Sequence, residues 1–127
     1  MPDHAYKLDG FRIFECAPEG PALRHGRDAT DLIGAAWREQ AVLVAIPAAR
    51  LGDDFFVLKT GIAGEVLQKF VTYRMRVVIT GDISRHLGES PALADFVREC
   101  NRGPNIWFVP DVRTAAEWLR GGPGLAE

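Results

Sequence analysis

Short apolar runs separated by longer amphipathic stretches limit what this chain can fold into. Three runs are almost continuously apolar and are each followed by a proline or glycine: residues 42–46 (VLVAI), 76–80 (RVVIT) and 106–109 (IWFV). Strands of this kind are covered on both faces, as they are in parallel sheets. Residues 11–16 form a further apolar run, which ends at the turn-forming stretch 17–21. We therefore expect four strands.

The segments between and after these runs have the periodicity of helices. Their apolar positions are Leu32, Ile33, Ala36 and Trp37; Ile62, Val66, Phe70 and Tyr73; Leu93, Phe96 and Val97; and Ala115, Trp118 and Leu119. Asp28, the pair Ser90 and Pro91, and Asp111 have the residue types that begin helices. We expect the tryptophans Trp37, Trp107 and Trp118 to pack in the core.

The alternation predicts a single α/β domain over residues 1–127, in the order β-α-β-α-β-α-β-α. Strands that are joined through helices run parallel, so the sheet should be mainly parallel, with four or five strands and helices packed on it. Residues 22–25 are a candidate edge strand. The core should span about residues 11–120, between a flexible N-terminal segment and a flexible C-terminal tail.

Composition excludes several classes of protein. The 127 residues include 15 Lys and Arg against 17 Asp and Glu, a formal net charge of -2, so there is no basic footprint for nucleic acid. No apolar run reaches the roughly 18–20 residues that cross a membrane. The first residues do not resemble a signal peptide, which predicts a cytoplasmic protein. Cys16 and Cys100 should be reduced thiols, and neither a metal site nor a cofactor is expected.

The segment from Thr60 to Glu65 (TGIAGE) is the densest candidate site. Thr60 stands where a helix begins, and free N–H groups at a helix start favour an anion or a phosphorylated side chain. Gly61 and Gly64 would let a ligand or a backbone approach closely. The alternative is an ordinary helix cap with two glycines that allow tight packing on the sheet.

A second candidate site lies at the carboxyl ends of the strands, where ligands bind in open parallel sheets. Its candidate residues are Asp54, Thr60, Asp82, Ser84 and Arg102, and Asp53, Asp54, Asp82 and Asp111 could form one acidic rim. Asp82, Ser84 and His86 form a D-x-S-x-H pattern, but Asp and Ser favour a capping turn there over a catalytic triad. No catalytic residue is assigned.

The run Phe55-Phe56-Val57 falls where a loop is expected. An exposed apolar run of this kind would suit the interface of a homodimer. The alternative is that these side chains fill the core beneath the connector.

Several segments resemble the DUF4180 proteins, an uncharacterised bacterial family. The matching stretches lie within residues 46–56, 60–70, 73–74, 81–84, 96–103 and 107–111. The resemblance covers most of the chain from about residue 28 onward and implies no activity.

The run Thr60-Gly61-Ile62-Ala63-Gly64-Glu65-Val66-Leu67 is also similar to the switch segment of STAS domains, the anti-sigma-factor antagonists. In that family a Ser-Gly pair opens the helix after a buried strand, and a partner kinase phosphorylates the serine. The resemblance implies that Thr60 is the phosphoacceptor. Leu58 and Lys59 depart from the Asp-Ser that usually precedes the acceptor.

Two functions follow from these patterns. The first is a non-enzymatic, STAS-like regulatory or protein-interaction module, with a kinase or another regulator as partner. The alternative is a small-molecule-binding domain or enzyme that uses the crevice at the carboxyl ends of the strands.

Overall fold

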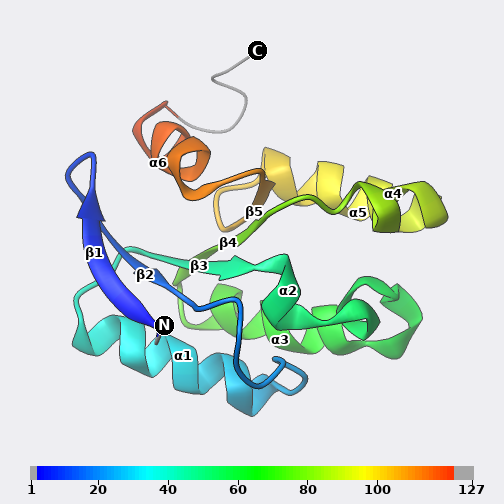
Figure 1. Cartoon of the computed structure of the whole chain (residues 1–127), viewed down its shortest axis with the longest axis horizontal. Coiled ribbons are helices and arrows are strands. Elements are labelled where there is room, and N and C mark those ends of the chain that lie inside the picture. The colour runs from blue at the N-terminus through cyan, green and yellow to red at the C-terminus, as the bar shows by residue number, and fades with distance from the viewer. Residues whose placement is uncertain (1–2, 122–127) are drawn as a thin grey trace.

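The computed structural model describes residues 3–121 and contains one five-stranded sheet in the order β1-β2-β3-β4-β5 (Figure 1). The strands are β1 (His4–Leu8), β2 (Phe11–Glu15), β3 (Leu43–Pro47), β4 (Arg76–Thr80) and β5 (Ile106–Val109). β1 pairs with β2 antiparallel, whereas β2, β3, β4 and β5 pair in parallel. The prediction of an α/β fold with a mainly parallel sheet is confirmed.

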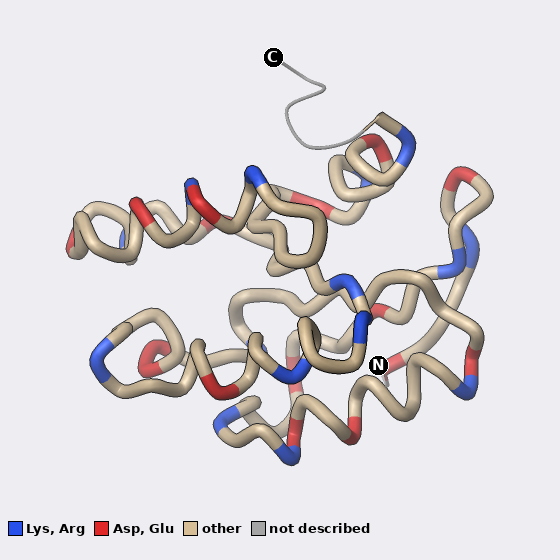
Figure 2. The backbone as a smooth tube through the Cα atoms, turned by 180° about the vertical axis from the view of Figure 1, so that it is seen from behind, with Lys and Arg blue, Asp and Glu red and all other residues tan. Residues whose placement is uncertain are grey.

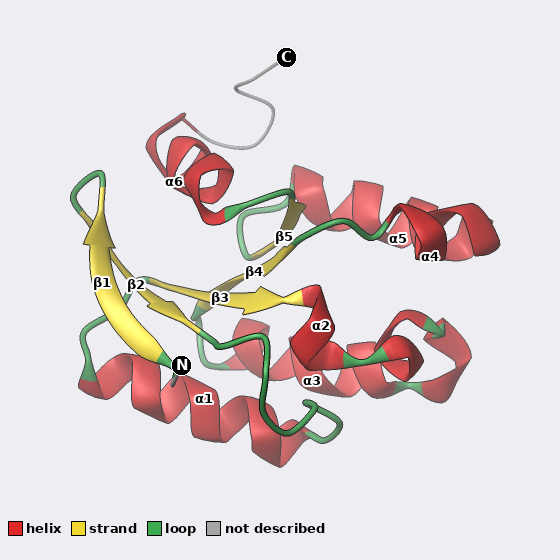
Figure 3. Ribbon diagram, in the orientation of Figure 1, coloured by secondary structure: helices red, strands yellow, loops and turns green. Residues whose placement is uncertain are grey.

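Helices connect the parallel strands, as the periodicity predicted (Figure 3). The longer ones are α1 (Gly26–Arg38), α3 (Ile62–Thr72), α5 (Pro91–Arg102) and α6 (Val112–Gly121). Two short helices, α2 (Ala48–Leu51) and α4 (Ser84–Glu89), and two 3-10 turns, η1 (Asp53–Phe56) and η2 (Leu58–Thr60), lie in the connections. Ser90 caps α5 as expected, because its hydroxyl accepts a hydrogen bond from the Leu93 amide at 3.1 Å.

Five strands agree with the predicted four or five, but the position of the additional strand is a correction. β1 lies in the segment that was expected to be flexible, and residues 22–25 form no strand. Asp9 and Gly10 join β1 to β2 with φ angles of 53° and 86°, the left-handed backbone that a two-residue hairpin requires. The expected flexible tail falls within residues 122–127, which lie outside the described part of the chain.

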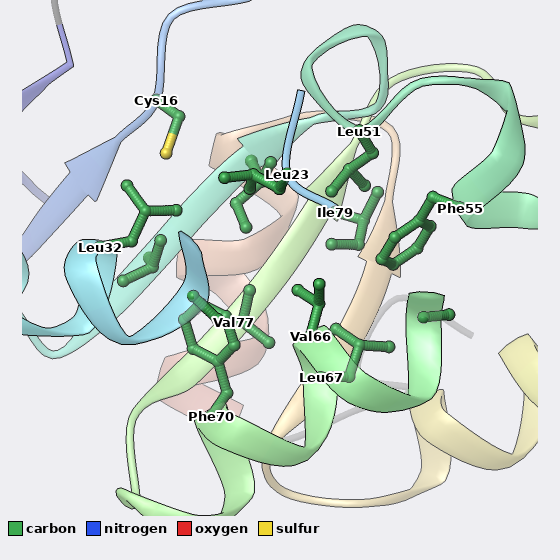
Figure 4. Close-up of a cluster of buried hydrophobic side chains, with 14 of the residues drawn as sticks. Cys16, Leu23, Leu32, Leu51, Phe55, Val66, Leu67, Phe70, Val77 and Ile79 are labelled. Atoms are coloured by element: carbon green, nitrogen blue, oxygen red, sulfur yellow. The ribbon is translucent and has the colours of Figure 1, made fainter. Parts of the chain in front are cut away.

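The two faces of the sheet are covered unequally. Val77 and Ile79 of β4 point into the larger core beneath α1, α3 and α5, while Val78 lies in a smaller core with Trp107 and α6. Figure 4 shows the larger core, where Phe70 of α3 lies beside Val77. Burial on both faces explains the continuous apolar run of residues 77–79 in β4.

The connector between β3 and α3 contributes to the larger core. Phe55 and Phe56 are buried, and only Val57 of this run is exposed. The interpretation that the run fills the core is therefore confirmed for the two phenylalanines. The run no longer argues for a dimer, and the oligomeric state stays a prediction.

Trp37 and Tyr73 were expected on buried helix faces, and the structure corrects both. Their exposed fractions are 51% and 43%. Both stand in the last turn or at the cap of a helix, where the chain bends back toward the next strand and the sheet no longer covers the side chain.

Candidate functional site

Thr60 is exposed at the end of η2, immediately before α3. Its hydroxyl is within hydrogen-bond distance of two backbone carbonyl oxygens, those of Asp54 at 3.0 Å and Val57 at 2.8 Å. The same oxygen accepts a hydrogen bond from the Ile62 amide at 3.2 Å. One hydroxyl therefore closes the η1–η2 connector and satisfies an amide in the first turn of α3.

Gly61 and Gly64 place two residues without side chains at the exposed start of α3. Gly61 has a φ angle of 79°, a left-handed conformation that favours glycine. A Cβ atom added at either glycine would meet nothing within 4 Å, so the interpretation that both glycines serve tight packing is wrong. Gly64 stands inside a helix, where glycine costs about 1 kcal/mol relative to alanine.

Glu65 ends the TGIAGE segment, and the structure gives its side chain a role in a neighbouring helix. Its carboxylate accepts a hydrogen bond from the Gly26 amide at 2.6 Å, at the start of α1. A negative charge at this position also complements the dipole of α1. The segment that opens α3 therefore also holds the beginning of the neighbouring helix.

The carboxylates that were expected to form one acidic rim are engaged within the molecule. Asp54 pairs with Arg24 at 3.1 Å, and Asp53 pairs with Arg85 at 2.9 Å. Asp111 accepts hydrogen bonds from the Thr114 amide and hydroxyl, and the amide bond is the main cause that lowers the pKa of Asp111. Basic and acidic positions are interspersed over the molecule (Figure 2).

Asp82, Ser84 and His86 do not form a catalytic triad. Asp82 accepts hydrogen bonds from the hydroxyl and the amide of Ser84, and the hydroxyl is the main cause that lowers the pKa of Asp82. The His86 ring instead stacks on Phe56, with ring centroids 4.3 Å apart, and its Nε2 lies 3.7 Å from Asp53. The predicted capping turn is confirmed.

Two cavities lie at the carboxyl ends of the strands, and Asp82 lines both. The first, of about 540 Å³, is lined mainly by apolar residues of β4, α4, α5 and β5, with Asp82, Ser84 and Asn101 as polar groups. The second, of about 410 Å³, includes Asp82, Asp111 and Glu15.

The candidate residues therefore fall into separate groups. Asp54 and Thr60 meet in the connector before α3, and Asp82 and Ser84 meet at the start of α4. The Arg85–Asp53 ion pair links the two segments. Arg102 ends α5, at the opposite end of that helix from Ser90, and lines neither cavity.

Asn101, next to Arg102 in the chain, was not predicted to have a role of its own. Its side-chain amide donates to the Phe108 carbonyl at 3.2 Å and accepts from the Phe108 amide at 2.7 Å. Asn101 thereby provides hydrogen-bond partners for the Phe108 amide and carbonyl on the side of β5 that has no neighbouring strand.

A buried ion pair at Arg50 and Asp3 was not predicted from the sequence. Arg50, in α2, is 8% exposed, and its guanidinium donates to the Asp3 carboxylate and to the carbonyls of Ala17 and Pro21. Burial alone raises the pKa of Asp3, but the hydrogen bonds from Arg50 and the Ala17 amide outweigh it and lower that pKa. No sequence signal marks this residue, because its partners lie 29 to 47 positions away.

The two cysteines are unsuited to nucleophilic chemistry at neutral pH. Burial raises the pKa of Cys16 to about 12 and the pKa of Cys100 to about 11, and both are free thiols. Within residues 3–121, no group of three or more His, Cys, Asp or Glu side chains could hold a metal ion. In the same range, no helix has the length and apolar character needed to span a bilayer.

The fold and the site define a small α/β protein. At the carboxyl ends of its parallel strands, it has an exposed helix start and two open cavities. The chain belongs to the family described as "Domain of unknown function (DUF4180)", whose model matches residues 8–119. The resemblance to this family is thus confirmed. Searches of the curated proteins and of the solved structures found no match to the chain.

Proposed function

We propose that this protein is a non-enzymatic, STAS-like regulatory module that binds a protein partner through the start of α3, with Thr60 as its phosphoacceptor. The observation that carries the proposal is the exposed residue Thr60 beside two glycines whose surroundings are open. A partner's active site or binding surface can approach a backbone that has no Cβ atoms in the way.

The position of Gly64 supports this role. Its alanine counterpart would be more stable by about 1 kcal/mol in a helix, and no neighbouring atom opposes the extra methyl group. The fold itself therefore does not need glycine here. Access by a partner explains why the position lacks a side chain.

Phosphorylation of Thr60 would change the local structure for a specific reason. Transfer of the γ-phosphoryl group of a nucleoside triphosphate forms a P–O bond to Oγ1 and breaks the bond from that phosphorus to the β–γ bridging oxygen. The nucleoside diphosphate leaves, and the hydroxyl proton passes to a base of the partner kinase. Oγ1 could then no longer donate to the carbonyls of Asp54 and Val57, which close the connector. The new negative charge would lie at the start of an 11-residue helix, where the dipole favours it.

The test is an affinity pull-down from cells that express the protein, read by mass spectrometry. We expect a partner that is retained by the wild type and changed in amount by Thr60→Glu, and we expect phosphate on Thr60 in the recovered protein. Thr60→Ser keeps a hydroxyl and should behave like the wild type. If Thr60→Glu and Thr60→Ala both recover the wild-type set of partners, the proposal is wrong.

Thr72→Glu is a matched control, because Thr72 is an exposed threonine in the last turn of the same helix. It introduces the same charge away from the proposed surface. A partner lost equally in Thr72→Glu and Thr60→Glu would indicate a general charge effect instead.

The second candidate function, binding of a small molecule, has its own supporting observation. Asp82 and Ser84 line an otherwise mainly apolar cavity of about 540 Å³, a volume within the range of ligand sites. A screen of small apolar amines by ligand-observed NMR tests it. Binding that survives Asp82→Asn, or no binding at all, would remove this candidate.

A further inference from the structure

The end of the molecule opposite Thr60 exposes an aromatic pair. The rings of Trp37, in the last turn of α1, and Tyr73, at the end of α3, meet edge to face with centroids 5.8 Å apart. About half of each residue is exposed, at 51% and 43%. Tryptophan and tyrosine are enriched among the residues that dominate binding energy at protein interfaces.

Each aromatic residue is followed by an arginine. Arg38 and Arg74 are both exposed, and within residues 3–121 neither forms an ion pair with a carboxylate. The nearby carboxylate of Glu39 is already paired with Arg12 at 3.2 Å. We call Trp37, Arg38, Tyr73 and Arg74 the aromatic patch. It carries two positive charges that no described carboxylate neutralises.

The backbone beside the patch has a conformation that costs free energy. Gln40 and Arg74 follow α1 and α3 with φ angles of 60° and 58°. Both helices end in the same hydrogen-bonded motif, closed by the Ala41 amide on the Ala36 carbonyl and by the Met75 amide on the Phe70 carbonyl. Glycine is the least strained residue at this left-handed position, yet the chain has long polar side chains at both.

We propose that the aromatic patch is a docking surface for an acidic, partly apolar segment of another protein. Apolar side chains of that segment would pack on Trp37 and Tyr73, while its carboxylates would pair with Arg38 and Arg74. The unneutralised arginines select an acidic partner, and the overall charge of -2 disfavours nucleic acid, which needs a more basic surface. This surface is independent of Thr60, so either proposal can fail alone.

The probe is a fluorescently labelled peptide rich in Glu and Leu, with a Lys-for-Glu counterpart as its control. We expect the Glu peptide to bind the full chain saturably by fluorescence anisotropy, and more weakly as salt is added. Trp37→Ala should weaken binding by about tenfold or more, as should the double variant Arg38→Glu with Arg74→Glu. The Lys peptide should not bind.

Two variants away from the aromatic patch are controls. Arg27→Glu reverses an exposed arginine at the other end of α1, and Val57→Ala truncates an exposed apolar side chain in the connector between η1 and η2. Both should bind the Glu peptide as the wild type does. Circular dichroism and thermal unfolding identify any variant that fails to fold, and Trp37→Phe, which keeps an aromatic ring, should retain most of the affinity.

Several results would overturn the proposal. They are no saturable binding of the Glu peptide, equal binding by the wild type and Trp37→Ala, or preferred binding of a single-stranded oligothymidylate. A wild-type dimer that Trp37→Ala dissociates would also overturn it, because a second copy of the chain would then occupy the patch.

Discussion

The two ends of the parallel strands differ in how charged side chains are used. At the carboxyl ends, Arg50 is buried against Asp3, and nearby acidic residues are paired with arginines. At the amino ends, Arg38 and Arg74 have no carboxylate partner among the described residues, and the aromatic residues that precede them in the chain, Trp37 and Tyr73, are exposed.

This difference has a local cause. The starts of α1 and α3 are satisfied by side chains, those of Glu65 and Thr60, which draw the surrounding loops together. The ends of α1 and α3 are closed mainly by backbone hydrogen bonds, although Arg12 also donates to the Glu39 carbonyl at the end of α1. The side chains of Trp37 and Tyr73 remain exposed there. Substitutions at the two ends should therefore have opposite effects on stability: losses at the carboxyl ends and gains at the amino ends.

The largest loss is expected for Arg50→Ala. This change leaves the Asp3 carboxylate and the carbonyls of Ala17 and Pro21 without their donor. The free energy of unfolding should fall by about 3 kcal/mol, measured by urea denaturation. A loss below about 1 kcal/mol would mean that water replaces the guanidinium, and the contrast between the two ends would then be much weaker.

Acidification should remove part of the same stabilisation. The pKa of Asp3 is lowered in the folded protein, so its contribution is present above the ordinary value of 3.8 and is lost as the pH falls through the folded-state pKa. The difference in unfolding free energy between the wild type and Arg50→Ala should therefore shrink below about pH 4. Asp3→Asn should remove this pH dependence. A difference that stays constant down to pH 2 would show that Asp3 does not titrate in this contact.

At the amino ends, Arg74→Gly should stabilise the protein by about 1 kcal/mol, because glycine adopts the left-handed backbone without strain. Gln40→Gly should act in the same direction. Denaturant midpoints measure both, and Thr72→Gly, in the last turn of α3, is the control that should instead lose about 0.3 kcal/mol. If Arg74→Gly is neutral or destabilising, contacts within the protein hold Arg74 in place, and its conformation no longer supports a docking surface.

The smallest effect is expected for Arg24→Ala. Its ion pair with Asp54 is exposed on both sides, with side-chain exposures of 48% and 58%. Such pairs contribute about 0–1 kcal/mol, so the change in unfolding free energy should be at the limit of measurement. A loss comparable to that of Arg50→Ala would show that the ion pairs at the carboxyl ends of the strands act as one network.

Parts of the site could be predicted from local chemistry, and other parts could not. Ser84 bonded to Asp82 and the Ser90 cap follow from turn and cap preferences that act within three residues. The Asp9-Gly10 pair is an equally local signal for a hairpin turn, although no hairpin was predicted there. The Gly26–Glu65 contact joins residues 39 positions apart and has no local signal.

The sequence by itself determined the alternation of strands and helices and the bounds of β4 and β5. Their residues are apolar at every position that faces either core, and that pattern is a property of the chain alone. Only the tertiary structure decided which helix residues are buried. Trp37 and Leu32 both belong to the apolar stripe of α1, yet Leu32 is 7% exposed and Trp37 is 51% exposed. Periodicity tells which side of a helix is apolar, but the extent of the sheet beneath it decides how much of that side is covered.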